Sequence, residues 1–251
     1  MEGKPIIAGN WKMHKTTNEG SAFAMSVQNI LVDIKNVSVV FSPPFIGLFE
    51  LEVESPFFKA AQNCHWEDHG AFTGEISTSM IKSCGAEFVI IGHSERRQYF
   101  GDSNKWINKK IKSVIAEELN PIFCIGETLD ERESGKTEER LRNQIVKGLD
   151  GLKDLNKIVI AYEPVWAIGT GKTANNLQIR EAHSYIKKVI KGLYPSIQDI
   201  QVLYGGSVKP SNAGELICVP HVDGFLIGGA SLDVDSFSSI VQIVEDIQEN
   251  K

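Results

Sequence analysis

The stretch KIVIAYE, residues 157–163, decides the fold because it is one of a set of similar runs. Short β-branched and apolar runs bounded by turn residues are typical of buried β-strands. Each run is followed by a segment with helical spacing, and the eight runs are residues 5–10, 37–42, 58–63, 88–93, 120–126, 157–163, 200–206 and 224–229. Their order predicts strands that alternate with helices.

The segments between the runs have apolar residues spaced three and four apart, as in amphipathic helices. Residues 103–119 predict a helix whose charged side chains, among them Lys110, lie away from an apolar face made of Ile107, Ile111, Val114 and Ile115. Residues 175–192 predict another helix, with Asn175 or Asn176 placed to cap its start. These helices would cover the outside of a sheet.

Eight strand–helix units in 251 residues predict an α/β protein with a (β/α)8 barrel. A doubly wound sheet, the main alternative, more often has about five to seven strands. No linker rich in Pro, Gly or Ser divides the chain. We therefore expect one barrel domain over residues 1–251.

Composition limits the partners and the location. The net charge of -6 argues against a nucleic-acid partner, and no apolar run is long enough to span a membrane, so we expect a cytoplasmic protein. The four widely spaced cysteines predict reduced thiols. Residues 64–69, CHWEDH, contain side chains that suit zinc but lack a second pair of ligands, so a polar loop tip is favoured and no metal is expected.

The residues that follow the predicted strands point to chemistry, because these strand ends meet at one mouth of a barrel. They are Asn10-Trp11-Lys12, His93-Ser94-Glu95, Glu163, Gly205-Gly206-Ser207 and Gly228-Gly229. Taken singly, such residues are commonly a surface lysine, a structural histidine or turn glycines. Together on one rim they favour proton transfer next to the carbonyl of a small phosphorylated compound, with phosphate at the last two turns and no cofactor.

The stretch AYEPVWAIGTGK, residues 161–172, has three possible interpretations: a loop folded into the core, a phosphate loop, or a hinged cover over a catalytic group. A P-loop has the pattern G-x-x-x-x-G-K-[ST], which would place its first glycine at position 166. That position is Trp166, and Pro164 makes the segment stiffer still. Nucleotide binding is therefore disfavoured.

Seven segments resemble the triosephosphate isomerase family, in order and along essentially the whole chain. They are GNWKMHK (9–15), GAFTGEIS (70–77), IIGHSERR (90–97), CIGETLDERESG (124–135), AYEPVWAIGTGKTA (161–174), LYGGSV (203–208) and DGFLIGGASL (223–232). The resemblance implies a single-domain TIM barrel. It also implies a cofactor-independent isomerase of glycolysis and gluconeogenesis, which interconverts dihydroxyacetone phosphate and D-glyceraldehyde 3-phosphate through an enediolate.

The resemblance also implies roles for individual residues. Glu163 would be the catalytic base, His93 the electrophile, and Lys12 the cation that attracts and steadies the substrate. Asn10 would bind substrate oxygens, and Glu95 would support the site beside Lys12. The phosphate would be held by backbone N–H groups of four residues: Gly169, Ser207, Gly228 and Gly229.

By the same resemblance, residues 164–166 and 172–174 would be two hinges of a lid whose tip is residues 167–171. Ile168 would face Glu163 when the lid closes, and Tyr204 and Ser207 would latch it near Ala174 and Gly171. A hinged lid suits an enediolate, which loses phosphate when water enters.

Members of the family are similar in being homodimers, which implies that Thr73 reaches toward Asn10 and His93 of the other subunit. The tip of that loop, residues 65–69, is bulkier and more charged than the resemblance predicts. An exposed Trp66 would mark an extra contact or cap a subunit pocket.

Two other functions remain open from the residues alone. One is a different barrel enzyme for a phosphorylated substrate, which would use the phosphate-binding turns but would not be expected to combine Lys12, His93 and Glu163. The other is a non-catalytic protein that keeps the fold, for which the loss of a catalytic residue would be the simplest sign. An isomerase assay separates the three.

Overall fold

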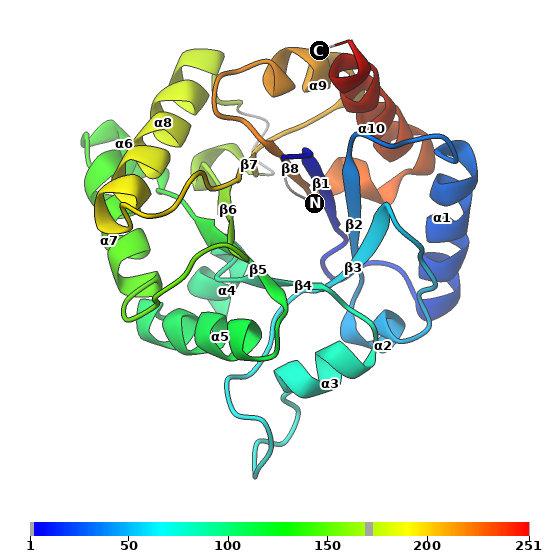
Figure 1. Ribbon diagram of the computed structural model, residues 1–251, viewed down its shortest axis with the longest axis horizontal. Helices are drawn as coiled ribbons and strands as arrows, with labels where there is room; N and C mark the ends of the chain where they lie inside the picture. The colour runs from blue at the N-terminus through cyan, green and yellow to red at the C-terminus, as the bar shows by residue number, and fades with distance from the viewer. Residues whose placement is uncertain (1–2, 169–172, 251) are drawn as a thin grey trace.

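Eight parallel strands close into a barrel in the computed structural model, which describes residues 3–168 and 173–250. The strands follow one another in sequence order, and β1 pairs with both β2 and β8. They are β1 (Ile6–Asn10), β2 (Ser38–Ser42), β3 (Phe57–Ala61), β4 (Phe88–Ile91), β5 (Asn120–Ile125), β6 (Val159–Tyr162), β7 (Val202–Tyr204) and β8 (Gly224–Ile227). Each predicted run overlaps one strand, and the predicted barrel is confirmed (Figure 1).

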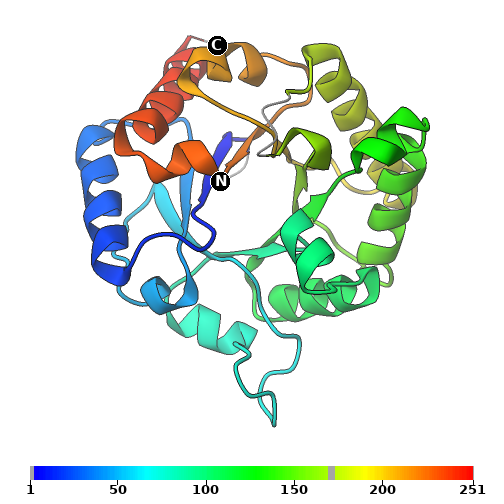
Figure 2. The ribbon, with the colours of Figure 1, turned by 180° about the vertical axis from the view of Figure 1, so that it is seen from behind.

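Helices form a ring outside the barrel, as Figures 1 and 2 show from its two ends. They are α1 (Thr17–Ile30), α2 (Phe45–Leu48), α3 (Thr78–Ser83), α4 (Ser94–Tyr99), α5 (Asn104–Ala116), α6 (Leu129–Glu133), α7 (Thr137–Gly148), α8 (Asn176–Leu193), α9 (Pro210–Ile217) and α10 (Val234–Glu249). Two 3-10 helices, η1 (Val165–Ala167) and η2 (Gly229–Leu232), follow β6 and β8. Within the described residues, no helix combines the length and the apolar character that crossing a bilayer requires.

The core has two layers because successive side chains of a strand point to opposite faces. In β5, Ile122 and Cys124 belong to the inner cluster that fills the barrel. Phe123 and Ile125 belong to the larger cluster between the barrel and the helices. Strands buried on both faces are apolar throughout, which explains why the predicted runs are continuous rather than alternating.

Lys110 of α5 does not lie where the sequence predicts. Ile107, Ile111 and Val114 of this helix are fully buried as expected, but the Lys110 side chain is also buried and its Nζ lies 2.8 Å from Asp102 Oδ2. The spacing of three from Ile107 puts Lys110 on the same side of the helix. The prediction for Lys110 was wrong because the neighbouring carboxylate, from outside the helix, compensates the buried charge.

The start of α8 is capped by Asn175 rather than Asn176. The Gln178 N–H donates to Asn175 Oδ1 at 2.9 Å, and the Asn175 N–H donates to Gln178 Oε1 at 3.0 Å. This reciprocal capping box satisfies two N–H groups that have no acceptor inside the helix. It fixes where the chain enters α8 after β6 and η1.

The loop between β3 and α3 projects away from the barrel, at the bottom of Figure 1. Trp66 is partly buried rather than exposed. Its ring stacks on His65 with centroids 4.2 Å apart, lies 5.6 Å from the Trp106 ring of α5, and is covered by Lys109 Nζ at 4.8 Å. The expected exposure of Trp66 and its place at the loop tip are not what the structure shows, because the indole packs against Trp106 and Lys109 of α5.

Candidate active site

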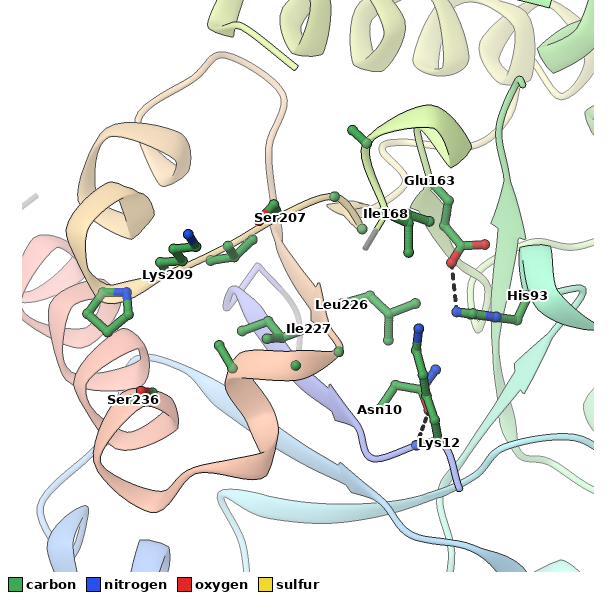
Figure 3. A pocket seen from close by; sticks show the side chains of 18 of the residues that line it. Asn10, Lys12, His93, Glu163, Ile168, Ser207, Lys209, Leu226, Ile227 and Ser236 are labelled. Carbon is green, nitrogen blue, oxygen red and sulfur yellow. Dashed lines mark hydrogen bonds and ion pairs between the residues drawn. The ribbon is translucent and has the colours of Figure 1, made fainter. Parts of the chain in front are cut away.

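A pocket of about 690 Å³ opens where the strands end (Figure 3). The sequence-predicted residues that line it are Asn10, Lys12, His93, Glu163, Ile168, Ser207, Gly228 and Gly229. They lie at or after the ends of β1, β4, β6, β7 and β8, so residues far apart in the chain meet at one mouth. The barrel topology produces this meeting, since parallel strands bring their carboxyl ends to the same rim.

Glu163 and His93 form a buried pair at the edge of the pocket. His93 Nε2 lies 2.9 Å from Glu163 Oε1, and both side chains are less than a tenth exposed. The other carboxylate oxygen, Oε2, accepts a hydrogen bond of 3.0 Å from the Ser94 N–H. Glu163 is thus held at two points at the edge of the pocket.

Glu163 favours its ionised carboxylate form, although the side chain is buried. Burial raises the pKa of Glu163, but His93, the Ser94 N–H and Lys12 lower it, and the net pKa is below the ordinary value. Hydrogen bonds and a nearby cation favour the charged form in this way. The group is therefore ionised at neutral pH and can accept a proton.

His93 precedes α4 and caps it. Its Nδ1 accepts a hydrogen bond of 3.3 Å from the Glu95 N–H, which places the proton of a neutral ring on Nε2. Burial lowers the pKa of His93, while the Glu163 carboxylate raises it and gives a net upward direction in this arrangement. In the neutral ring, Nε2 carries the proton and faces Glu163 Oε1.

Lys12 provides a cation in the same pocket. Its Nζ lies 2.6 Å from Glu95 Oε1, and both groups are partly exposed. The Lys12 backbone has a φ of 54°, in the left-handed region, and its N–H donates to Asn10 Oδ1 at 3.0 Å. Such a conformation is uncommon for a residue with a side chain and is found at functional sites.

The opposite end of the pocket is built from backbone. Gly228 and Gly229 follow β8, and η2 begins at Gly229. The first N–H groups of a helix have no acceptor inside it and attract anions. A Cβ at Gly228 would lie 3.4 Å from Lys12 Cε, so the glycine leaves room between this backbone and the lysine. Ser207, labelled in Figure 3, lines the same end.

The segment after Glu163 is anchored at both of its described ends. Trp166 donates from Nε1 to Oε1 of the fully buried Glu127 at 2.9 Å, and Tyr162 donates to the same oxygen at 3.1 Å. On the other side, the backbone N–H of Ala174 donates to the buried Tyr204 hydroxyl. Burial raises the pKa of Tyr204 to about 12, so this hydroxyl is neutral.

Two predicted features are not among the described residues of the pocket. Gly169 and the Gly171 end of the predicted latch are outside the described residues. Thr73 is exposed on the projecting loop and does not line the pocket of its own chain. Over residues 3–168 and 173–250, no group of three His, Cys, Asp or Glu side chains has the arrangement of a metal site.

Several pocket residues were not predicted from the sequence. Lys209, Ser211 and Ser236 belong to the beginnings of α9 and α10 rather than to strand ends, so no strand signal marks them. Gln62, which supports the pocket without lining it, was within reach of prediction because it follows β3 directly. Its amide donates to the carbonyl oxygens of Lys12 and Ser42, both at 2.8 Å, and so holds the strained backbone at Lys12.

Comparisons with known proteins agree with this geometry. Residues 5–244 match the family model described as triosephosphate isomerase. The chain is 49% identical to triosephosphate isomerase of Prosthecochloris aestuarii, over 96% of this chain and 98% of that protein. It is 50% identical to the Geobacter metallireducens protein of the same name, over 94% and 97%. The crystal structure of triosephosphate isomerase from Bartonella henselae has a TM-score of 0.88 at 35% identity, covering 96% of this chain and 98% of that chain.

Proposed function

The chain belongs to the triosephosphate isomerase family, and from that premise we propose how its residues perform the family's reaction. It is an isomerase that interconverts dihydroxyacetone phosphate and glyceraldehyde 3-phosphate, a step of glycolysis. This family is itself a standard example of a glutamate base beside a neutral histidine, so these two roles are carried over from it.

Glu163 removes a proton from the carbon next to the substrate carbonyl. His93 donates a hydrogen bond from Nε2 to the carbonyl oxygen, and Lys12 stabilises the negative charge that develops there. Asn10 binds the substrate oxygens. The observation that supports this assignment best is the 2.9 Å pair of Glu163 and His93, buried beside Lys12 in one pocket.

The phosphate group binds at the opposite end of the pocket. Backbone N–H groups of Ser207, Gly228 and Gly229 donate hydrogen bonds to its oxygens, and Gly169 is proposed as a fourth donor. Glu95 keeps Lys12 in position, which its 2.6 Å contact supports. Ile168 lines the pocket on the side of Glu163, where an apolar residue excludes water from the base.

An isomerase assay coupled to reduction of dihydroxyacetone phosphate tests the proposed chemistry. The expected result is turnover of glyceraldehyde 3-phosphate, with solvent deuterium incorporated into the product in heavy water because Glu163 exchanges the abstracted proton. Turnover without any exchange would argue for direct hydride transfer and against a base. No turnover by folded protein would contradict the assigned roles.

Replacing Tyr204 by Phe is expected to lower kcat by about fivefold, because one hydrogen bond contributes on the order of 1 kcal/mol. The hydroxyl holds Ala174 at the second hinge, and Tyr204 does not line the pocket. Steady-state kinetics measure the change. Tyr194→Phe, which also removes a hydroxyl bonded to a backbone group, is the matched control. An unchanged kcat in Tyr204→Phe would show that the latch is dispensable.

The working form is a homodimer in which Thr73 reaches the partner's pocket. Large apolar side chains are exposed on the segments that follow β1 to β4, among them Met13, Ile46, Met80 and Phe100. An apolar surface of this kind is expected to be covered by a partner.

The cytoplasm is the location that we propose, in keeping with four free cysteines.

Size-exclusion chromatography with light scattering is expected to give twice the chain mass of 27.8 kDa. Thr73→Arg, which places a long charged side chain in the interface, is expected to shift the protein to monomer and to lower its activity. Thr137→Arg, a substitution at the start of α7, is the control and leaves the mass unchanged. A parent protein with monomer mass at assay concentration would remove the dimer proposal.

A further inference from the structure

Gln144 of α7 makes an unusual contact with the barrel. Its side chain is almost fully buried and does not line the pocket. The Gly126 N–H donates to Gln144 Oε1 at 2.8 Å, and Gln144 Nε2 donates back to the Gly126 carbonyl oxygen at 3.1 Å. Both halves of one amide therefore bind the backbone of one residue, so Gln144 fixes Gly126 in position and orientation.

Gly126 in turn lies against the backbone of Glu163. It follows β5 directly, and a Cβ added to it would lie 1.7 Å from the Glu163 carbonyl oxygen. On either side of it, the Glu163 N–H donates to the Ile125 carbonyl at 2.7 Å, and the Val165 N–H donates to the Glu127 carbonyl at 3.1 Å. Residues 125–127 thus hold the backbone from 163 to 165 as an extension of the β5–β6 pairing.

We propose that Gln144 is a positioning residue for the catalytic base, acting through Gly126 on the backbone of Glu163; the inference rests on the proposed role of that glutamate. Proton abstraction needs the carboxylate within a narrow range of distance and angle. A displacement of about 1 Å costs on the order of 10²-fold in rate. An apolar side chain would fill the same space at this position of α7, but it would leave the Gly126 N–H and carbonyl without partners.

The alternative is that Gln144 only satisfies two buried backbone groups. In that case its replacement lowers stability and leaves the chemical step unchanged. Gln144→Met keeps the length of the side chain and removes both hydrogen bonds. We expect its kcat to fall by about 10- to 100-fold, with KM and inhibition by inorganic phosphate within about twofold of the parent.

A kinetic isotope effect separates positioning from stability. With glyceraldehyde 3-phosphate deuterated at C2, the isotope effect on kcat is expected to be larger in Gln144→Met than in the parent, because proton abstraction becomes slower relative to the other steps. Gln144→Glu keeps an acceptor for the Gly126 N–H and is expected to recover part of the lost kcat. A lower Tm with parent values of kcat and of the isotope effect would assign Gln144 a structural role and overturn the proposal.

Two glycine substitutions test the path from Gln144 to Glu163. Gly126→Ala places a methyl group against the Glu163 carbonyl and is expected to lower kcat at least as much as Gln144→Met. Gly148→Ala is the matched control on α7, since the three atoms nearest to its Cβ would all belong to the Phe123 ring, the first at 2.3 Å. We expect Gly148→Ala to lower Tm and to keep kcat near the parent value.

The results also distinguish this inference from the proposed function. If Glu163→Gln loses turnover while folded Gln144→Met and Gly126→Ala keep it, the positioning role is wrong and the base assignment stands. If Glu163→Gln keeps its turnover, the base assignment fails and the positioning role fails with it. Should Gln144→Met not fold, the kcat and isotope effect of Gln144→Glu decide: parent values overturn the proposal, and a lower kcat with a larger isotope effect supports it.

Discussion

Replacement of Glu163 by Gln is expected to lower kcat by about 10²- to 10⁴-fold, the range that a positioned general base contributes. The amide keeps the shape of the side chain but cannot accept a proton from carbon. Binding of inorganic phosphate, measured as competitive inhibition, is expected to stay near the parent value, because the phosphate end of the pocket is built from the backbone after β7 and β8.

The surroundings of Glu163 define the control for this variant. Both carboxylate oxygens accept hydrogen bonds, from His93 Nε2 and from the Ser94 N–H, so the NH2 group of glutamine faces a donor in either orientation. Circular dichroism and Tm are needed to show that the variant is folded. Glu163→Asp keeps the acceptor but withdraws it by one methylene, and we expect its kcat to lie between those of the parent and Glu163→Gln. Near-normal turnover of folded Glu163→Gln would refute its role as the base.

The meeting of Glu163 and His93 in one pocket was predictable from the sequence, because it follows from the repeat of strands. Glu163 and His93 each follow an apolar run, and parallel strands in a barrel deliver their carboxyl ends to one rim. Their distance of 2.9 Å was not predictable, since it depends on side-chain rotamers and on α4 beginning at Ser94. The repeat predicts which residues meet, and tertiary packing decides how they touch.

Residues whose environment depends on a single long-range partner escaped prediction. Lys110 is one, because its partner Asp102 lies outside the α5 pattern. Gln144 is another, because only the approach of the Gly126 backbone explains the burial of this polar side chain. Helical periodicity describes one face of a helix, and it does not identify a polar side chain whose partner comes from another element.

Replacement of Lys12 by Met is expected to lower kcat/KM by about 10²- to 10³-fold, the effect of losing one donor to a developing oxyanion. This large effect is expected because the positive charge of Lys12 lies inside the pocket. Lys12 Nζ lies in the pocket beside Asn10 (Figure 3), where partial exclusion of water strengthens its attraction for the substrate. KM is expected to rise because the ground state loses a cation, and kcat to fall because the transition state is more negative at the carbonyl oxygen.

Lys209 provides the matched control, since it lines the same pocket and carries the same charge. It belongs to the approach to α9 and not to the catalytic end, so Lys209→Met is expected to change kcat/KM only a few-fold. Similar losses in both variants would show that the net charge of the pocket matters rather than a contact made by Lys12. Unchanged inhibition by inorganic phosphate in Lys12→Met, together with an unchanged kcat, would remove Lys12 from the site. A fall in kcat larger than the rise in KM would place its main effect in the transition state.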